Sequence, residues 1–320
     1  MKEWKKYRIK TIAEAEDSVI NCLNDLGITG VEIEDNIPIS EEDRKTLYID
    51  ILPELPDDNT AYVSFYIDKD EEDKELINKI TEELEKLRST MDIGSGMIES
   101  DITREEDWVN NWKAYFRPLS VGDVFIKPSW TDEYETPEGM VPISIDPGTS
   151  FGTGMHETTQ LAIRQICKYM EKGDWVLDIG CGSGILSIIA LKLGASYASL
   201  IDVDPIAVDA SMKNLEVNGI SDRSFSVMPG NILEDPSVAD ALGLACFDVV
   251  VANILADVVI PLFPHALKLL KPGGVYIMSG IYMDKADDVE AAVYKQGMEL
   301  VDLLYQGDWV SIVARKKYTH

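Results

Sequence analysis

The stretch Val176-Leu177-Asp178-Ile179-Gly180-Cys181-Gly182-Ser183-Gly184 decides the fold, because a short apolar run leads directly into three glycines at alternate positions. The residues that follow, 185–193, have helical composition, so the pattern predicts a strand, a tight turn and a helix. Backbone without side chains can approach a ligand very closely. Open α/β sheets bind their ligands outside the carboxyl ends of the strands, so we expect a ligand at this turn.

The glycine spacing discriminates between ligands. A dinucleotide-binding fingerprint requires Gly-x-Gly-x-x-Gly, but counted from Gly180 the sixth position is Ile185, and counted from Gly182 it is Ser187. The Gly-x-Gly-x-Gly form instead resembles the first motif of the class I S-adenosylmethionine-dependent methyltransferases. The resemblance implies a loop that lies along the adenosine and methionine parts of that cofactor, since there is no pyrophosphate to hold.

Composition narrows the class of protein. With 320 residues, of which 45% are apolar, we expect two globular domains. The balance of 57 acidic against 29 basic residues, a net charge of −28, argues against direct nucleic-acid binding and favours basic partners. Four dispersed cysteines and three histidines suggest neither a disulfide framework nor a metal site, which predicts a cytoplasmic protein. Polar residues Asn253 and Asp257 interrupt the most apolar run, so no membrane span is expected.

The first third of the chain alternates strand-like and helix-like segments. We predict strands at 4–12, 46–52, 61–67 and 97–102, and helices at 13–26 and 71–89. The order β-α-β-β-α-β indicates a small ferredoxin-like α+β domain over residues 1–104. The aromatic and polar segment 105–118 is predicted to be a linker helix.

The remainder, 119–320, is predicted to form the second domain. From residue 174 to near 290 strands and helices alternate, which is typical of a doubly wound, mostly parallel, Rossmann-like sheet. Residues 300–306 and 309–316 flank Gly307-Asp308 and indicate a hairpin, so an antiparallel strand should close one edge. This ending is typical of the seven-stranded class I methyltransferase sheet.

The predicted strand 197–202 ends at Asp202, and Asp204 lies two residues further on; both are about as far from Gly180 as a ribose-binding acid should lie. Asp204 directly precedes Pro205, a favoured first helical residue, and is therefore expected to be a helix N-cap. This leaves Asp202 as the ribose ligand, against the alternative that both acids merely cap a turn. The carboxylate of Asp178 is expected to accept hydrogen bonds from loop amides or to reach the ammonium group of the cofactor.

Asn253 ends the predicted buried strand 247–253, where amino-group methyltransferases carry an Asn-Pro-Pro-Tyr-like motif; the two prolines are missing here. An amide offers an acceptor and two donors, so it can bind a neutral amine with the nitrogen lone pair aimed at a sulfonium methyl. The alternative is that Asn253 caps the next helix. The glycine motif upstream favours the catalytic interpretation.

A longer set of segments closely resembles the bacterial methyltransferases of ribosomal protein L11, over about residues 105–316. The segments are 107–130, 148–159 (GTSFGTGMHETT), 176–184, 201–205 and 251–255. The resemblance implies that S-adenosylmethionine is held by Thr159, Gly180, Gly182, Asp202 and Asn253, with Asn253 at the reacting centre and no metal. His156 lies in the same region; it is expected to be structural, with a role as proton acceptor as the alternative.

In that family, methyl groups pass to the α-amino group and to lysine ε-amino groups of the ribosomal protein, a basic partner that the small amino-terminal domain recognises. We expect this chain to be a monomer and to act on the same partner. One alternative keeps the fold but changes the target to rRNA, a glutamine amide or a small molecule; the net charge argues against rRNA, and the missing prolines weaken the glutamine case. Another alternative is a non-catalytic S-adenosylmethionine-binding module.

Overall fold

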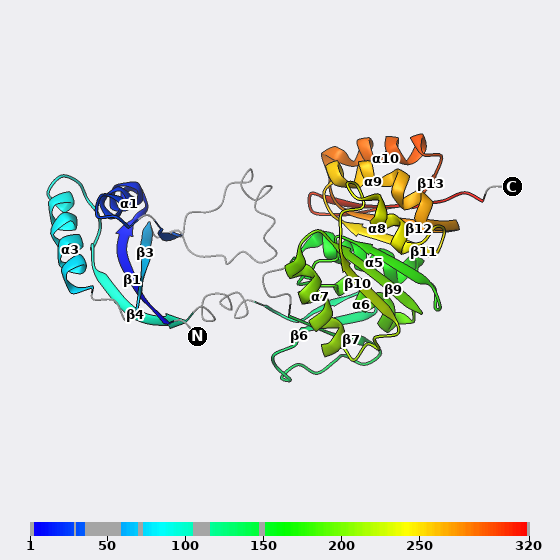
Figure 1. The fold of residues 1–320 in the computed structure, drawn as a ribbon, viewed down its shortest axis with the longest axis horizontal. Coiled ribbons are helices and arrows are strands. Elements are labelled where there is room, and N and C mark those ends of the chain that lie inside the picture. Colours follow the sequence, from blue (N-terminus) through cyan, green and yellow to red (C-terminus); the bar gives the residue numbers. More distant parts are fainter. Residues whose placement is uncertain are drawn as a thin grey trace. The chain divides into compact units, whose positions relative to one another are not determined.

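The computed structural model describes residues 3–28, 30–35, 59–69, 73–104, 116–146 and 151–318. The chain divides between residues 115 and 116 into two compact units, each with its own sheet (Figure 1).

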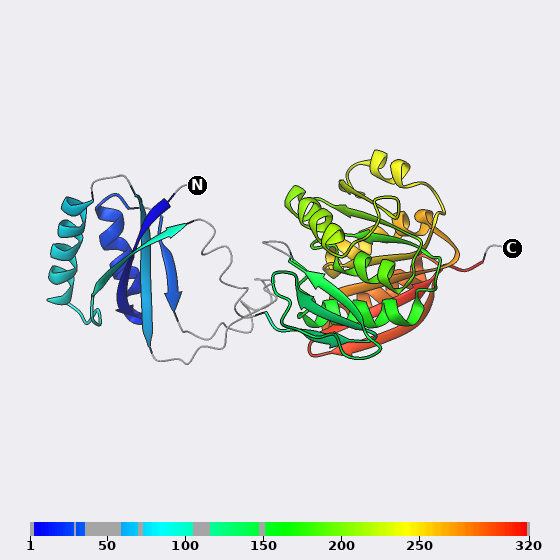
Figure 2. The same cartoon turned by 90° about the horizontal axis from the view of Figure 1, so that it is seen from below.

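The first unit is an antiparallel sheet with helices on one face (Figure 2). Its elements are β1 (Glu3–Ile12), η1 (Ala13–Ala15), α1 (Glu16–Asp25), β2 (Glu32–Asp35), β3 (Thr60–Asp68), α3 (Lys74–Arg88) and β4 (Ile98–Arg104). The strand order is β2-β3-β1-β4, and the described elements follow one another as β-α-β-β-α-β, although the second strand is not the one predicted at 46–52. The strand predicted at 46–52 and residues 105–115 of the predicted linker helix lie outside the described residues.

Alternation along β1 builds the core of this unit. Tyr7 and Ile9 face inward, and the ring of Tyr7 stacks on Phe65 of β3 with 5.3 Å between the ring centroids. Helices α1 and α3 bury their apolar stripes in the same cluster through residues such as Leu23 and Ile80. The sheet and both helices therefore share one core.

Strand β2 escaped prediction because its sequence, Glu-Ile-Glu-Asp, is mostly charged. Its carboxylates pair with basic residues of β1: Glu32 accepts from Lys6 at 3.0 Å, and Glu34 accepts from Arg8 at 2.6 Å. Because these partners come from another strand, the local pattern of β2 gives no sign of them.

The second unit contains a small three-stranded sheet and a seven-stranded sheet. Its elements are β5 (Leu119–Val121), β6 (Val124–Pro128), β7 (Val141–Ile145), α5 (Glu157–Tyr169), β8 (Trp175–Ile179), α6 (Ile185–Leu193), β9 (Tyr197–Asp202), α7 (Pro205–Val217), β10 (Phe225–Pro229), α8 (Pro236–Leu242), β11 (Phe247–Asn253), α9 (Ala256–Leu269), β12 (Leu270–Tyr282), η3 (Met283–Lys285), α10 (Ala286–Lys295), β13 (Glu299–Gln306) and β14 (Trp309–Arg315). Helices α5, α6 and α7 cover one face of the large sheet, and α8, α9 and α10 cover the other (Figure 1).

The strand order β10-β9-β8-β11-β12-β14-β13 confirms the predicted doubly wound sheet and corrects one detail. The predicted hairpin forms, but its antiparallel strand β14 lies between β12 and β13 and does not close the edge. The edge strand is β13, which runs parallel to β12 because it is antiparallel to β14. A hairpin pattern in the sequence predicts that its two strands pair with each other. It does not predict which of the two pairs with the rest of the sheet.

The large sheet places the glycine turn at its topological switch point. The strand order reverses between β9 on one side of β8 and β11 on the other. Both neighbours of β8 run parallel to it, and residues such as Leu177 and Val250 are fully buried between the two helix layers. The crevice at the carboxyl ends of these strands is where such sheets bind ligands. In the part of the chain that the structure describes, no helix has the length and apolarity to cross a bilayer.

Candidate active site

The turn after β8 can be built only with glycine. Gly180, Gly182 and Gly184 have φ of +73°, +54° and +78°, in the left-handed region that side chains disfavour. A Cβ on Gly180 would lie 2.8 Å from Cγ2 of Ile254, and a Cβ on Gly182 would lie 2.6 Å from the carbonyl oxygen of Phe151. The turn therefore brings three chain segments into close contact.

Hydrogen bonds fix the turn in place. Ser183 donates its N–H to the carbonyl oxygen of Phe151 at 2.9 Å and its hydroxyl to that of Gly152 at 2.6 Å. From α7, Ser211 donates to the carbonyl oxygen of Gly182 at 2.8 Å, and Asn214 donates to that of Ser183 at 2.9 Å. Sequence reasoning missed Ser211 and Asn214; the available signal was two polar residues three apart on the predicted helix, both of which are buried.

Asp202 ends β9 directly beside the turn. Its Oδ2 accepts the N–H of Gly182 at 2.9 Å, and its Oδ1 accepts the N–H of Asp204 at 3.0 Å. Asp204 in turn caps α7 by accepting the N–H of Ile206 at 2.9 Å, which confirms the predicted N-cap. Each carboxylate oxygen of Asp202 has a further lone pair for a ligand. The exposed apolar side chains of Val203 and Ile206 lie beside it in the sequence.

Asp178 is a fully buried carboxyl group inside β8. Its Oδ2 accepts the hydroxyl of Ser187 at 2.8 Å, whereas its Oδ1 has no hydrogen-bond partner among the described residues. Burial raises the pKa of Asp178 to about 7, with the nearby charge of Asp202 acting in the same direction. We expected Asp178 to accept hydrogen bonds from loop amides or to reach the ammonium group of the cofactor. Its side-chain donor is instead the hydroxyl of Ser187 in α6. The Oδ1 of Asp178 is therefore a buried acceptor that lacks a partner among the described residues.

Asn253 ends β11 and contacts the first turn of α5. Its Nδ2 donates to Oγ1 of the fully buried Thr159 at 3.2 Å, and its buried Oδ1 has no partner among the described residues. Helix α9 begins at Ala256, and its N-cap is Leu255 without a side-chain bond, so Asn253 does not cap that helix. The structure thus brings together Thr159 and Asn253, and places Ile254 against Gly180.

His156 is the N-cap of α5. Its Nδ1 accepts the N–H of Thr158 at 3.3 Å and lies 2.8 Å from the hydroxyl of the same residue. The histidine ring also packs between Phe151 and Trp309, with centroid distances of 5.7 and 5.1 Å, and Trp309 stacks on Tyr282 at 3.9 Å. These contacts give His156 a structural role. The aromatic row escaped prediction because Trp309 and Tyr282 are distant in the sequence.

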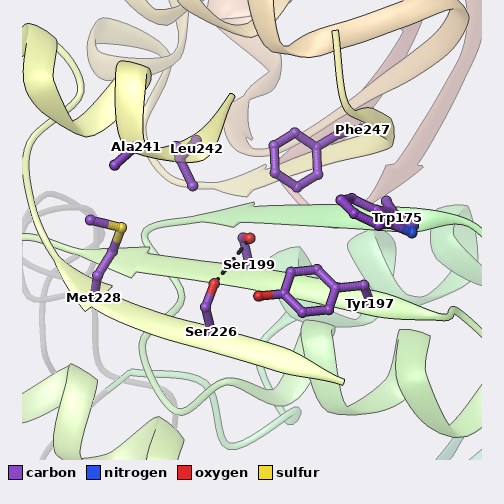
Figure 3. Close-up of a pocket in the computed structure, with 8 residues that line it drawn as sticks. All are labelled: Trp175, Tyr197, Ser199, Ser226, Met228, Ala241, Leu242 and Phe247. Atoms are coloured by element: carbon purple, nitrogen blue, oxygen red, sulfur yellow. Dashed lines mark hydrogen bonds between the residues drawn. The ribbon is translucent and has the colours of Figure 1, made fainter. Parts of the chain in front are cut away.

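A pocket of about 520 Å³ lies elsewhere in this unit (Figure 3). Trp175, Tyr197 and Phe247, which line it, are the first residues of β8, β9 and β11, so the pocket lies toward the amino ends of the strands. The glycine turn, Asp202 and Asn253 lie at the opposite ends. Its lining, which also includes Ser199, Ser226, Met228, Ala241 and Leu242, contains no ionisable carboxylate, amine or imidazole that could bind a charged ligand. We therefore place the candidate active site at the carboxyl edge.

The carboxyl edge offers a specific set of acceptors. Asp178 Oδ1 suits an ammonium group, the carboxylate of Asp202 suits vicinal hydroxyls, and Asn253 Oδ1 suits an amine N–H. The glycines of the turn beside these acceptors have no side chains, so a flat ligand can approach the backbone closely. This set fits an adenosyl sulfonium amino acid together with an amine, and it contains no evident nucleophile of its own.

Comparisons with known proteins agree on one family. The family model "Ribosomal protein L11 methyltransferase (PrmA)" matches residues 3–317. The chain is 47% identical to the ribosomal protein L11 methyltransferase of Lachnospira eligens over 98% of this chain and 100% of that one. It is 46% identical to that of Agathobacter rectalis over 98% and 99%. A solved ribosomal protein L11 methylase from Lactobacillus delbrueckii subsp. bulgaricus matches with a TM-score of 0.56 and 31% identity, and covers 63% of this chain and 100% of that one.

Proposed function

Because the chain belongs to the family of ribosomal protein L11 methyltransferases, we propose that it transfers methyl groups from S-adenosylmethionine to amino groups of ribosomal protein L11. The observation that carries the proposal is the amide of Asn253. Its Nδ2 is engaged by Thr159, which leaves a buried, unpartnered Oδ1 at the carboxyl edge of the described sheet. A buried acceptor without a partner is costly, and a substrate N–H would satisfy it.

We assign the cofactor to the residues around the glycine turn. Bound there, S-adenosylmethionine supplies a methyl group on a positively charged sulfur. Gly180 and Gly182 would allow its close approach, and Asp202 would accept its ribose hydroxyls. Asp178 Oδ1 would accept its ammonium group. Thr159 accepts from Asn253, so its own hydroxyl hydrogen can be donated to the cofactor.

The substrate amine must be uncharged to attack the methyl group. An unperturbed lysine with a pKa near 10.4 is neutral in roughly one molecule in 10³ at neutral pH, whereas an α-amino group with a pKa near 7.7–8.0 is deprotonated far more readily. Asn253 Oδ1 accepts an N–H of the neutral amine but cannot favour the ammonium form as strongly as a carboxylate would. An amide at this position therefore orients the lone pair and raises the amine pKa less than a carboxylate would.

Proton removal is assigned to water. His156 caps α5, and Asp178 is assigned to the ammonium group of the cofactor. The amine would lose its proton before the attack, and the Asn253 contact would then align it with the methyl group. The contribution of this chain to catalysis would thus be alignment and proximity more than acid–base chemistry.

We propose that residues 1–104 recognise the protein substrate, that 105–118 link the domains, and that 119–320 bind the cofactor and catalyse transfer. In support, each unit has its own core, and all of the acceptors assigned above belong to the second unit. The net charge of −28 suits a basic ribosomal protein. A chain limited to residues 116–320 should keep its S-adenosylmethionine Kd within about threefold and lose transfer to the protein, as measured by calorimetry and by label transfer.

A radiolabelled-methyl assay tests the function. The full chain is incubated with labelled S-adenosylmethionine and purified ribosomal protein L11, with free rRNA and a small-molecule extract in parallel reactions. We expect label in the protein, and mass spectrometry should locate it on amino groups. Label only in RNA or small molecules would show another target, and cofactor binding without any transfer would show a non-catalytic module.

A further inference from the structure

A buried serine joins β12, the neighbour of the strand that carries Asn253, to the helix that carries Thr159. Ser279 lies in β12 opposite Asn253 of β11 and is fully buried. Its hydroxyl donates to the carbonyl oxygen of Thr158 at 2.7 Å, across 121 positions of sequence. Thr158 is in the first turn of α5, directly before Thr159.

The hydrogen bonds around Ser279 form a closed ring. Ile254, next to Asn253, donates its N–H to the carbonyl oxygen of Ser279 at 3.1 Å, which joins β11 to β12. Ser279 joins β12 to α5, and Asn253 closes the ring by donating to Thr159 at 3.2 Å. The two backbones lie close together here, because a Cβ on Gly280 would lie 2.7 Å from the carbonyl oxygen of Ile254. Within the ring, the hydroxyl of Ser279 makes the hydrogen bond that joins β12 to the start of α5.

We propose that Ser279 is a positioning residue for methyl transfer: it holds the first turn of α5 so that Thr159 fixes the direction of the Asn253 amide. This inference rests on the proposed function of Asn253. Without the hydroxyl, α5 would still pack on the sheet through apolar contacts, but such contacts are not directional. Thr159 would then move relative to Asn253, and the amide would turn between orientations that offer oxygen or nitrogen to the substrate.

The neighbouring strand offers a matched control. Ser311 of β14 is also fully buried, and its hydroxyl also donates to a backbone carbonyl of β12, that of Met278, at 2.9 Å. Its bond joins two strands and does not reach α5. Ser279→Ala and Ser311→Ala thus remove the same atom from equally buried sites and leave the same kind of carbonyl without its donor. Only Ser279→Ala breaks the ring.

The test compares full-length variants by kcat, S-adenosylmethionine Kd and thermal unfolding. We expect both alanine variants to lower the unfolding temperature by similar amounts. In Ser279→Ala, kcat should fall about tenfold and Kd should rise by a smaller factor, because Thr159 is assigned to the cofactor as well. In Ser311→Ala, kcat should fall less than about twofold and Kd should stay within about threefold. Equal kcat in the two variants would overturn the proposal. Ser279→Cys, which keeps a weak donor, should have an intermediate kcat and serves as the test if the alanine variant does not fold. A folded Ser279→Cys variant with wild-type kcat would then overturn the proposal.

A double variant separates this inference from the function on which it rests. If Ser279 acts through Asn253, adding Ser279→Ala to Asn253→Ala should lower kcat by less than about twofold further. Multiplicative losses would show that Ser279 acts independently, against the proposal. If Asn253→Ala alone leaves kcat unchanged, the proposed function of Asn253 fails instead, and the Ser279 and Ser311 variants should then have the same activity.

Discussion

Replacing Gly182 by alanine tests the proposal that the cofactor approaches the backbone of this turn closely. Alanine at φ +54° carries the cost of a left-handed backbone, about 1–2 kcal/mol. Its Cβ would also lie 2.6 Å from the carbonyl oxygen of Phe151. That oxygen is backbone and accepts the N–H of Ser183, so it can move only if the loop moves with it. Relieving such an overlap costs about 1–3 kcal/mol more.

The control is Gly219→Ala. Gly219 has φ +66°, after the end of α7, and an added Cβ would meet nothing within 4 Å. This variant therefore carries the backbone cost without the overlap. The overlap at Gly182 displaces the turn from the ligand, so a cost of about 2 kcal/mol corresponds to a Kd for S-adenosylmethionine raised roughly 30-fold.

Calorimetric titration with S-adenosylmethionine and thermal unfolding would be measured for both variants. Both should unfold at lower temperatures than the wild type, because each places a side chain in the left-handed region. Only Gly182→Ala should bind the cofactor more weakly; Gly219→Ala should keep its Kd within about twofold. Equal affinities in the two variants would refute the inference that the cofactor lies against this turn.

Three further predictions concern the acceptors of the site. Asp202→Ala should raise the S-adenosylmethionine Kd by roughly 30-fold or more, since it removes a charged acceptor, and kcat at saturating cofactor should fall much less. Calorimetry would measure the Kd and initial rates the kcat. A large fall in kcat with an unchanged Kd would contradict the ribose assignment. Asn253→Ala should lower kcat about tenfold and leave Kd within about threefold, which label transfer and calorimetry would show; an unchanged kcat would contradict its catalytic role. Because the folded pKa of Asp178, about 7, exceeds the unfolded value near 3.9, its contribution to stability is fully present below about pH 4 and is lost as the pH rises toward 7. The affinity for S-adenosylmethionine should depend on pH in the opposite direction, because its ammonium group binds the charged form of Asp178. Measured by calorimetry, this affinity should rise between about pH 5.5 and 7.5. Asp178→Asn should flatten the rise.

The elements predicted most accurately are those set by local chemistry. The ends of α6 were predicted at residues 185 and 193 because glycines precede and follow it, and α7 begins at Pro205 after the cap of Asp204. Asp202 and the glycine turn could be proposed as site residues for the same reason: they are close in the sequence and also form the turn itself. In these stretches the sequence contains nearly all of the interactions that determine the structure.

What the sequence did not reveal depends on partners from distant segments. Strand β2 pairs with β3 and its carboxylates pair with Lys6 and Arg8 of β1, and the place of β14 is decided by its pairing with β12. A serine in a buried strand such as Ser279 has no pattern that marks it. Its importance comes from the carbonyl of Thr158, which only the folded chain brings within 2.7 Å.

The use of an amide oxygen as the substrate acceptor has a consequence for successive transfers. A neutral primary amine has two N–H groups, its monomethylated form has one, and its dimethylated form has none. Asn253 Oδ1 can therefore accept a hydrogen bond during the first two transfers to one nitrogen and not during a third. A third transfer would depend on packing around the amine, for which the aromatic row of Phe151, His156, Trp309 and Tyr282 lies at the start of α5 and the end of β12. Loss of the Asn253 amide should accordingly slow the first two transfers to one nitrogen more than the third.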